Sequence, residues 1–427
     1  MFELNVNGKM VSSETDKTLL SFLRDDLKIT SAKDGCSEGA CGTCTVLVDG
    51  KAIKACVQKV SKFVGKKVVT VEGFDEHERA VYEYCFAAAG AVQCGFCIPG
   101  MVICAKALLD VNPNPTVADV KKAIRGNICR CTGYKKIEEA ILMAGKFFRE
   151  NLEIPEIPDE LHMNEHFNRP DAAEKVNGTG KYVDDIEFPD MIYAKAVRSK
   201  YPRAIVNKID ISKALAHPDC VRILLQSDVP NNVIGHVKQD WDVMIPEGGT
   251  TRYVGDAPLL HEDGNIMSKS TLVRGDVRTA LANSKYVVTQ KYKTPHQEHG
   301  FMEPECAIAV PEGDDGILMY TGSQSVYDEQ REIAAMLNIP KEKVHSHSML
   351  VGGGFGGKED MSVQHHAALM AWYTKKPVKV KFTRQESLAY HTKRHPMEIE
   401  ITTGCDENGI LKSSCRKGWY LSLGNSL

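Results

Sequence analysis

The sequence lacks a large excess of charge of either sign, and it lacks a recognisable export signal. Its 427 residues include 53 Lys and Arg and 56 Asp and Glu, which gives a formal net charge of −3. Such a balance creates no field that would gather nucleic acid or anionic lipid, so neither is an expected partner. The first residues have no basic start followed by an apolar core, and no internal repeat occurs. We therefore expect a cytoplasmic protein with about two to four globular domains.

One long stretch without a charged side chain, residues 84–105, resembles a membrane span in length alone. It contains Pro99, a glutamine, three glycines and four cysteines. These residues break helices or need polar partners, which a lipid-facing helix cannot supply. We therefore expect no membrane span.

Cysteine is abundant and unevenly placed. Ten of the 14 cysteines lie in the first 131 residues. A disulfide scaffold suits a small secreted chain, whereas this chain is long and has no export signal. The clustering therefore favours metal or redox use.

The first 152 residues divide into a β-rich part and a helical part. Asn7-Gly8 and Asp49-Gly50 are two-residue hairpin signals with a helical pattern between them, so residues 1–75 should form a small sheet crossed by a helix. A compact bundle is expected over residues 76–152 because four helical patterns follow one another, at 76–91, 99–110, 116–125 and 135–148.

The remaining chain combines a linker with an α+β region. Residues 153–172 are rich in proline and charge, which is typical of an extended linker. Residues 173–427 mix strand-like and helical patterns, so the predicted fold class is multidomain α+β. The predicted strands are 286–294, 306–311, 316–322, 379–383 and 397–404, and the predicted helices are 327–338 and 362–376.

Three cysteines within nine residues and a fourth shortly after have the spacing of a plant-type [2Fe-2S] site. The pattern is Cys-x4-Cys-x2-Cys-x11-Cys and comprises Cys36, Cys41, Cys44 and Cys56. Gly39 and Gly42 would let backbone N–H groups point at inorganic sulfides. A zinc site is the alternative, but zinc ribbons use paired Cys-x2-Cys motifs. The spacing therefore favours a two-iron cluster.

A second set of four cysteines follows in the helical part: Cys94, Cys97, Cys129 and Cys131. A Cys-x2-Cys motif alone is also typical of a thioredoxin-like dithiol or of half a zinc site. The nearby Cys-x-Cys, the absence of a βαβ pattern and the first quartet upstream favour a second [2Fe-2S] site. We expect the other six cysteines to be buried apolar thiols: Cys85, Cys104, Cys220, Cys306, Cys405 and Cys415.

A glycine-rich loop, "VGGGFGGKED" at 351–360, follows a strand-like run and precedes a helix. It matches a dinucleotide fingerprint and a P-loop only weakly, since Glu359 stands where a P-loop needs Ser or Thr. Its glycines allow several backbone N–H groups to approach one ligand, such as an oxo group or a phosphate. A tight turn between strand and helix is the structural alternative.

Together these motifs resemble those of a known family. "CSEGACGTC" with Cys56, "QCGFCIPG" and "CRCTGY" are similar to the two iron–sulfur domains of the xanthine dehydrogenase and aldehyde oxidoreductase family of molybdenum hydroxylases. The resemblance implies a β-grasp [2Fe-2S] ferredoxin domain at 1–75, a four-helix [2Fe-2S] domain at 76–152 and a partial α+β molybdopterin-binding region at 173–427. It also implies two [2Fe-2S] clusters and a molybdenum–pyranopterin cofactor.

The same resemblance implies residues for the cofactor site. Gln93 would contact the pterin; the alternative is an amide that satisfies a helix end. Gln324 lies 31 residues before Phe355, which is the interval in the family, and would hydrogen-bond an oxygen ligand of the molybdenum. Phe355 and Gly356 would lie beside the metal, in the loop that also contains Gly354.

The expected substrate depends on Glu359. It matches the position that hydrogen-bonds the purine ring in xanthine dehydrogenases, where aldehyde-oxidising members commonly have an apolar residue. The resemblance therefore favours a purine or xanthine-type substrate, hydroxylated with oxygen from water. A carboxylate in the first turn of a helix is the alternative for Glu359.

The sequence also departs from the family. The catalytic Glu base, a substrate-binding Arg and most pterin contacts of family members lie in a further stretch about as long as this chain. No flavin domain follows the iron–sulfur part, and a segment usually present after "RYVGDA" (252–257) is missing.

We therefore expect a flavin-lacking subunit, incomplete alone, in a homodimer or hetero-oligomer. Its electrons would pass to a separate FAD subunit or a ferredoxin-like acceptor. The alternatives are an aldehyde or other N-heterocycle oxidoreductase, and an electron-transfer subunit with an incomplete molybdenum lobe.

Overall fold

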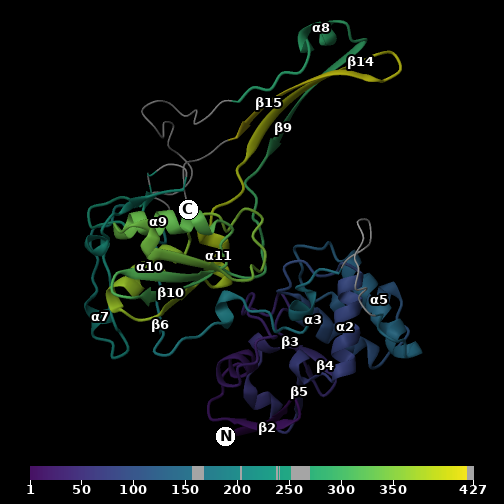
Figure 1. Ribbon diagram of the computed structural model, residues 1–427, viewed down its shortest axis with the longest axis vertical. Coiled ribbons are helices and arrows are strands. Elements are labelled where there is room, and N and C mark those ends of the chain that lie inside the picture. The colour runs from purple at the N-terminus through teal and green to yellow at the C-terminus, as the bar shows by residue number, and fades with distance from the viewer. Residues whose placement is uncertain (156–167, 202–203, 237–238, 240, 252–269, 421–427) are drawn as a thin grey trace. The chain divides into compact units, whose positions relative to one another are not determined.

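The computed structural model describes residues 1–155, 168–201, 204–236, 239, 241–251 and 270–420 (Figure 1). Most of the predicted linker and the "RYVGDA" junction lie outside these ranges. Among the described residues no helix has both the length and the apolar character needed to cross a bilayer. The chain forms two units. The first comprises Met1–Lys195, Gly300–Ile333 and Lys341–Ala389, and the second comprises Ala196–His299, Ala334–Pro340 and Tyr390–Leu427.

The N-terminal part of the first unit is a five-stranded sheet crossed by a short helix, as predicted. Its order is β2-β1-β5-β3-β4, with β1 and β5 parallel. Asn7 and Asp49 have φ values of 50° and 48°, which is the left-handed geometry of the predicted hairpin turns. Leu19 and Leu23 of the helical segment are fully buried against the sheet. The elements are β1 (Phe2–Val6), β2 (Lys9–Ser13), α1 (Leu19–Ser21) with a π-turn (Phe22–Asp26), β3 (Thr45–Val48), β4 (Lys51–Lys54) and β5 (Lys67–Val69).

Four helices follow, each within three residues of its predicted ends: α2 (Glu76–Ala88), α3 (Ile98–Leu109), α4 (Val117–Ile124) and α5 (Lys135–Glu150). Capping boxes at Asp75 and Thr116 begin α2 and α4, because each side chain accepts from a backbone N–H of the first turn. The uncharged stretch 84–105 forms the end of α2 and most of α3, and its side chains belong to the core of this bundle. The stretch is therefore apolar because it is buried inside protein.

A second sheet completes the first unit. Its order is β12-β11-β10-β13-β6, and α10 packs against β10, β11 and β13. β11 and β12 are parallel and are joined through α9. The elements are α6 (Ala172–Val176), β6 (Ile192–Tyr193), β10 (Cys306–Glu312), β11 (Gly316–Thr321), α9 (Val326–Leu337), β12 (Val344–Ser348), α10 (Gln364–Thr374), β13 (Val378–Lys381) and α11 (Arg384–Tyr390); α9 and α11 end in the second unit.

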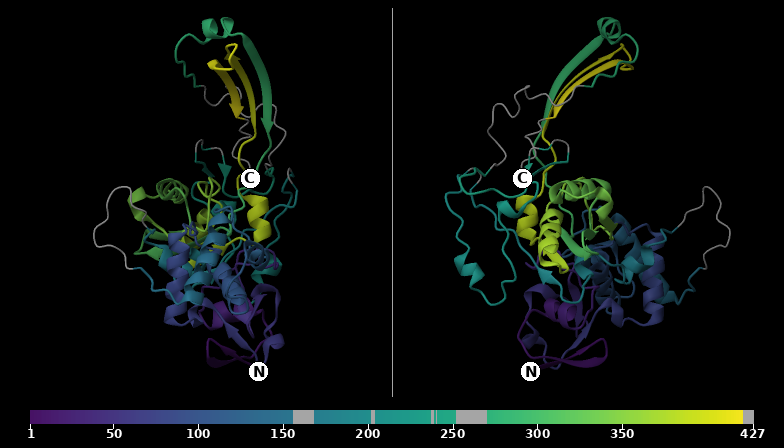
Figure 2. Two further views of the ribbon diagram at one scale, coloured as in Figure 1. Left: turned by 90° about the vertical axis from the view of Figure 1, so that its right-hand side faces the viewer. Right: turned by 60° about the vertical axis from the view of Figure 1, so that its left-hand side comes forward.

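The second unit contains a three-stranded antiparallel sheet with the order β15-β14-β9 (Figure 2). Lys291 and Lys293 of β9 pair with Glu400 and Glu398 of β14 across one face. Helix α8 packs on β14 and β15. The elements are α7 (Ser212–Leu215), β7 (Val233–Ile234), β8 (Trp241–Asp242), α8 (Val277–Ala282), β9 (Tyr286–Thr294), β14 (Met397–Cys405) and β15 (Leu411–Tyr420). The multidomain α+β class predicted from the sequence is confirmed.

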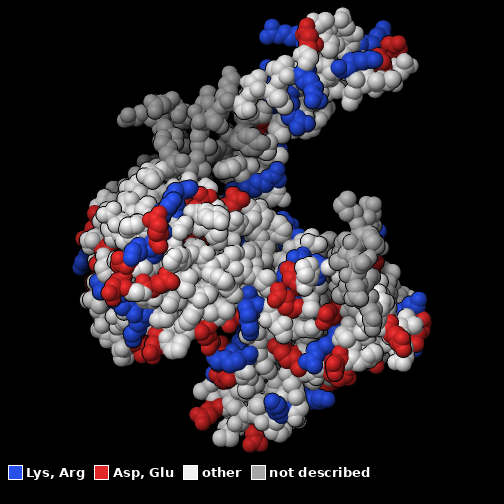
Figure 3. All heavy atoms as spheres, viewed as in Figure 1, with Lys and Arg blue, Asp and Glu red and all other residues white. Residues whose placement is uncertain are grey.

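Charged side chains of both signs are interspersed on the face of the molecule that Figure 3 shows. Ion pairs between near neighbours in the chain occur on α5 and at the end of α3. Lys136 pairs with Glu139 on α5 at 3.0 Å, and Lys106 of α3 pairs with Asp110 at 3.0 Å. This mixture agrees with the formal net charge of −3.

Candidate functional site: two cysteine quartets and a glycine-rich loop

The first cysteine quartet gathers in a loop between the helical segment and β3. All four of its residues are buried: Cys36, Cys41, Cys44 and, in the turn after β4, Cys56. The backbone N–H groups of Glu38 and Cys41 donate to Sγ of Cys36 at 3.5 and 3.4 Å. The hydroxyl of Thr43 lies 3.2 Å from Sγ of Cys41. The loop therefore directs two backbone N–H donors at the sulfur of Cys36.

The thiols of the first quartet are close enough to share protons. Hydrogen bonds from Cys41 and Cys56 lower the pKa of Cys36, and a hydrogen bond from Cys56 lowers that of Cys44. The pKa values of the two donors, Cys41 and Cys56, are raised, chiefly because each donates to Cys36. Four sulfurs packed in this way hold partial negative charge that metal ions would neutralise. The donor set therefore fits an iron–sulfur cluster.

The second quartet lies where three helix ends meet. Cys97 is the N-cap of α3 and Cys94 precedes it, whereas Cys129 and Cys131 lie in the turn between α4 and α5. A hydrogen bond from Cys131 lowers the pKa of both Cys94 and Cys129. The hydroxyl of Thr132 also donates to Sγ of Cys129 at 3.2 Å. Four sulfurs converge here, whereas an isolated dithiol would use two.

None of the 14 cysteines forms a disulfide. Across the described ranges, no group of three or more His, Cys, Asp or Glu side chains forms a site for a single metal ion. A [2Fe-2S] cluster instead divides four thiolates between two ions.

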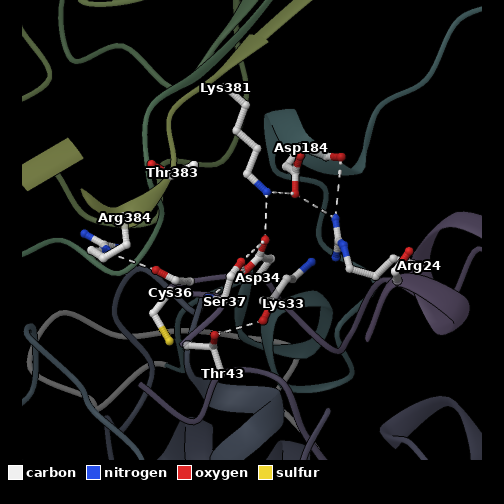
Figure 4. A network of polar contacts seen from close by, with 12 residues as sticks. Arg24, Lys33, Asp34, Cys36, Ser37, Thr43, Asp184, Lys381, Thr383 and Arg384 are labelled. Atoms are coloured by element: carbon white, nitrogen blue, oxygen red, sulfur yellow. Dashed lines mark hydrogen bonds and ion pairs between the residues drawn. The ribbon is translucent and has the colours of Figure 1, made fainter. Parts of the chain in front are cut away.

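Charged residues from distant parts of the first unit hold the loop that leads into the first quartet (Figure 4). Asp34 accepts from the backbone N–H of Ser37 at 3.1 Å and pairs with Lys381 of β13 at 3.3 Å. Arg384 of α11 donates to the carbonyl oxygen of Gly35 at 2.9 Å, one residue before Cys36. The contacts of Lys381 and Arg384 cannot be read from the sequence, because almost 350 residues separate each of them from its partner.

A second part of this network is more deeply buried. Asp185 pairs with Lys33 at 2.6 Å and with Arg24 at 2.8 Å. Lys33 and Asp185 are 2% and 1% exposed, so this pair is shielded from water. Asp184 pairs with Lys381 at 2.8 Å and with Arg24 at 3.1 Å (Figure 4). The network ties the N-terminal sheet to the segment after the predicted linker and to β13.

Side chains between the two quartets bring them into one cluster. Tyr182 is buried, donates to the carbonyl oxygen of Cys94 at 2.6 Å and makes an edge contact with Phe96. Both rings pack with Cys36, Cys41 and Met302. The backbone N–H of Ile128, next to Cys129, donates to the carbonyl oxygen of Cys41 at 2.8 Å. The two quartets are therefore connected by packed side chains and by a direct hydrogen bond.

The glycine-rich loop is hydrogen-bonded to Gln324, which the resemblance places at the same cofactor site. The side-chain oxygen of Gln324 accepts from the N–H groups of Gly356 at 3.0 Å and Lys358 at 3.2 Å. Because that oxygen faces two donors, the amide nitrogen must face away, and it bonds to no described residue. A Cβ on Gly354 would lie 2.2 Å from the Gln324 oxygen, so any larger residue there would displace the Gln324 side chain. Phe355 has a φ of 56° and is 48% exposed.

The structure thus brings Gln324, Gly354, Phe355 and Gly356 together. Phe355 holds a backbone conformation that costs free energy for a non-glycine residue, which is common at functional sites. Glu359 is exposed and lies five residues before α10, so it is not a carboxylate of a helix's first turn. Gln93 is also exposed, and its side chain bonds to no described residue. The helix-end alternative for Gln93 is therefore not what the structure shows.

One group of predicted thiols needs correction. Cys85, Cys104 and Cys306 are buried as expected, and burial raises the pKa of Cys85 to about 12 and that of Cys104 to about 11. The prediction was wrong for the other three, Cys220, Cys405 and Cys415, which are only partly buried. Cys405 and Cys415 lie on β14 and β15, and this narrow sheet provides too little cover to bury them.

Comparison with known proteins assigns families to successive parts of the chain. Residues 10–80 match the "2Fe-2S iron-sulfur cluster binding domain" and residues 70–142 the "[2Fe-2S] binding domain". Residues 177–257 match the "Aldehyde oxidase and xanthine dehydrogenase, a/b hammerhead domain", and residues 260–426 the "Molybdopterin cofactor-binding domain". These matches define a class of proteins that combine two [2Fe-2S] domains with a molybdopterin-binding domain.

Three relatives place it more closely. The nicotinate dehydrogenase small FeS subunit of Eubacterium barkeri is 46% identical over 33% of this chain and 92% of its own length. One subunit of a probable xanthine dehydrogenase of Bacillus subtilis is 35% identical over 60% of this chain and 40% of its own length. The aldehyde oxidoreductase of Megalodesulfovibrio gigas is 28% identical over 96% of this chain and 52% of its own length. The chain belongs to the molybdenum hydroxylase family of xanthine dehydrogenases and aldehyde oxidoreductases.

The solved aldehyde oxidoreductase from Desulfovibrio gigas has the same fold. It matches with a TM-score of 0.85 at 24% identity, over 98% of this chain and 54% of its own chain. This chain therefore spans about half the length of the aldehyde oxidoreductases that it matches. The predicted cofactors, two [2Fe-2S] clusters and molybdopterin, are those of the matched domains.

Proposed function

We propose that this chain is the iron–sulfur and partial molybdenum-binding subunit of a hydroxylase for purine or xanthine-type N-heterocycles. Water would supply the oxygen, and electrons would leave through both clusters. The observation that carries the proposal is the convergence, within one unit, of two cysteine quartets and a strained glycine-rich loop anchored to Gln324.

The eight quartet cysteines are the proposed cluster ligands: Cys36, Cys41, Cys44 and Cys56 for the first, and Cys94, Cys97, Cys129 and Cys131 for the second. Bound molybdenum–pterin would supply the two-electron oxidation of the substrate. Gln324 would orient the cofactor through its outward amide nitrogen, and Gln93 would bind the pterin. Gly354 and Gly356 would allow the backbone to approach, with the exposed Phe355 ring shaping the space beside the metal.

The substrate proposal depends on Glu359. This exposed carboxylate lies near the end of the loop, and it can accept a hydrogen bond from an N–H group of a heterocycle. Relatives named for nicotinate and nicotine also support a nitrogen heterocycle as substrate. An aldehyde substrate is the second candidate, because the relative that aligns with 96% of this chain is an aldehyde oxidoreductase.

A further polypeptide would complete the enzyme. Relatives named as separate subunits, including the small FeS subunit and the large molybdopterin subunit of a nicotinate dehydrogenase, support a hetero-oligomer with a separate FAD subunit or ferredoxin-like acceptor. The predicted homodimer, cytoplasmic location and domain limits belong to this proposal too. An electron-transfer subunit is a third candidate, because the relative named as a small FeS subunit is 46% identical over 33% of this chain and 92% of its own length.

The cluster ligands can be tested on the full chain purified anaerobically. It should contain about four iron atoms and show two distinct [2Fe-2S] signals in paramagnetic resonance. Cys131→Ser should remove one signal and spare the other, while the control Cys104→Ser, at a buried thiol outside both quartets, should keep both. Loss of both signals or of neither in Cys131→Ser would contradict the ligand assignment.

The substrate and the third candidate need the chain assembled with its complementary subunit. Oxidation of xanthine, nicotinate and an aldehyde should be compared, with molybdenum content measured alongside. The purine proposal is supported if the wild type oxidises xanthine and the Glu359→Ala variant does so more slowly. Turnover of the aldehyde alone selects the second candidate, and about four iron without molybdenum selects the electron-transfer subunit.

A further inference from the structure

A buried ion pair, Glu303 with Lys358, lies behind the glycine-rich loop. Their side chains are 3% and 5% exposed, and Oε2 of Glu303 lies 2.8 Å from Nζ of Lys358. Removing two charges from water costs several kcal/mol unless hydrogen bonds compensate, so such a pair is seldom kept for stability alone. Neither residue has a role in the proposed cluster ligands or substrate contacts.

The pair holds both ends of the glycine-rich loop. Oε2 of Glu303 also accepts from the backbone N–H of Gly352 at 2.7 Å, at the start of the loop. Lys358, at its other end, donates its backbone N–H to Gln324 and places its ammonium over the Phe301 ring at 4.8 Å. The position of the loop therefore depends on the carboxylate of Glu303.

The same carboxylate lies close to the second cysteine quartet. A Cβ on Gly352 would lie 2.3 Å from Cβ of Glu303 and 3.0 Å from the ring of Phe96, which stands between Cys94 and Cys97 in the sequence. Glu303 therefore lies beside the segment that contains Cys94 and Cys97, at a distance over which its charge acts on the quartet.

Lys358 contacts only one of the two carboxylate oxygens of Glu303, Oε2. Oε1 of Glu303 is buried and has no hydrogen-bond partner. Glu303 and Lys358 also line a small cavity together with Glu305, Asp360, Ser362 and Gln364. Because Glu303 and Lys358 are shielded from water, the field of a partly compensated charge acts over a longer distance than it would in water.

We propose that Glu303 and Lys358 are positioning residues that set the reduction potential of the second [2Fe-2S] cluster and fix the glycine-rich loop beside it. The inference rests on the proposed ligand assignment for that cluster. Reduction adds one negative charge to a cluster, so a nearby carboxylate disfavours the reduced form and a nearby ammonium favours it. The same ion pair would thus fix the loop of the proposed molybdenum site and influence the reduction potential of the second cluster.

The test is a redox titration of both clusters in the full chain, followed by paramagnetic resonance. Glu303→Gln keeps an oxygen for the Gly352 N–H but removes the charge, so the potential of the second cluster should rise. Lys358→Met should lower it, because the carboxylate then lacks its counter-charge. The double variant should return towards the wild type.

The controls separate charge from structure. Glu303→Asp keeps the charge and should stay closer to the wild type than Glu303→Gln does. The buried Glu329 accepts from Ser346 on β12, at 3.1 Å, and Glu329→Gln should leave both potentials unchanged. The first cluster is an internal reference in every sample.

Two failures can be told apart. A second cluster whose potential is unaffected by Glu303→Gln, or equal shifts in both clusters, would overturn the inference alone. A wild-type chain without a second signal would overturn the ligand assignment and the inference together.

Discussion

The buried carboxylate of Asp185 allows a stability prediction worked from the geometry. It accepts from Lys33 at 2.6 Å, from Arg24 at 2.8 Å and from the backbone N–H of Tyr182 at 3.1 Å, while being only 1% exposed. Asp185→Asn keeps the shape but leaves the buried Lys33 ammonium without its counter-ion. Breaking a buried pair from one side costs about 3–5 kcal/mol. We expect a loss of that size in the free energy of unfolding at pH 7.

The loss should depend on pH in a defined direction. Burial lowers the pKa of Lys33, and Asp185 opposes that shift. In Asp185→Asn the pKa of Lys33 should fall further, so its ammonium loses its proton more readily in the fold. A lysine with a lowered folded pKa destabilises the fold while it is charged, and this cost disappears as pH rises through that pKa. The deficit of the variant should therefore shrink between pH 7 and pH 10.

Acid should remove the difference as well. Although burial alone would raise it, Lys33 and Arg24 hold the pKa of Asp185 below its ordinary value. Its stabilisation is present above the ordinary carboxyl pKa of about 3.9 and is lost as pH falls through the lowered value. The wild type should therefore approach the variant in strong acid.

The assay is urea unfolding followed by circular dichroism, at several pH values from about 2 to about 10. The matched control is Glu139→Gln, whose partner Lys136 is 3.0 Å away in a pair that is about half exposed on α5. Such a pair contributes little, so the control should unfold like the wild type. A deficit below about 1 kcal/mol for Asp185→Asn at pH 7, or one that stays constant up to pH 10, would refute the reasoning.

Three further predictions concern the sites. Gly354→Ala should lower molybdenum retention and leave the iron content unchanged, because its Cβ would collide with the Gln324 oxygen; metal analysis that shows equal molybdenum would contradict this. Arg384→Met removes donors to the carbonyl oxygens of Gly35 and Met302, at 2.9 and 2.7 Å, and should change the resonance signal of the first cluster while sparing the second. Glu359→Ala should reduce kcat/KM for xanthine about tenfold or more, the cost of one charged hydrogen bond, with unchanged iron content as the check on folding.

The local elements were predictable because short-range rules decide them. The hairpins at Asn7-Gly8 and Asp49-Gly50 follow from residues that tolerate positive φ, and the ends of α2 to α5 follow from caps and apolar spacing. The interval between Gln324 and Phe355 pointed to two segments that the fold does bring together. Thr43 and Thr132 were missed, although each directly precedes or follows a quartet cysteine in the sequence and could have been noticed as a hydroxyl within reach of sulfur.

The burial of single cysteines was less predictable. Cys306 lies on a strand inside a five-stranded sheet, whereas Cys405 and Cys415 lie in a sheet of three strands. The number of layers that cover a strand decides its exposure, and that number is a property of the whole domain.

The sequence by itself determined the spacing of the eight cysteines and the glycine-rich loop, because ligand spacing and backbone freedom are local properties of a few residues. Tertiary structure alone decided which charges surround them. Arg384 reaches the loop before Cys36 from almost 350 residues away, and Glu303 meets Lys358 across 55 residues. Such pairs form only when packing excludes water and brings distant strands side by side, since the cost of burying each charge is offset only by a partner already in place.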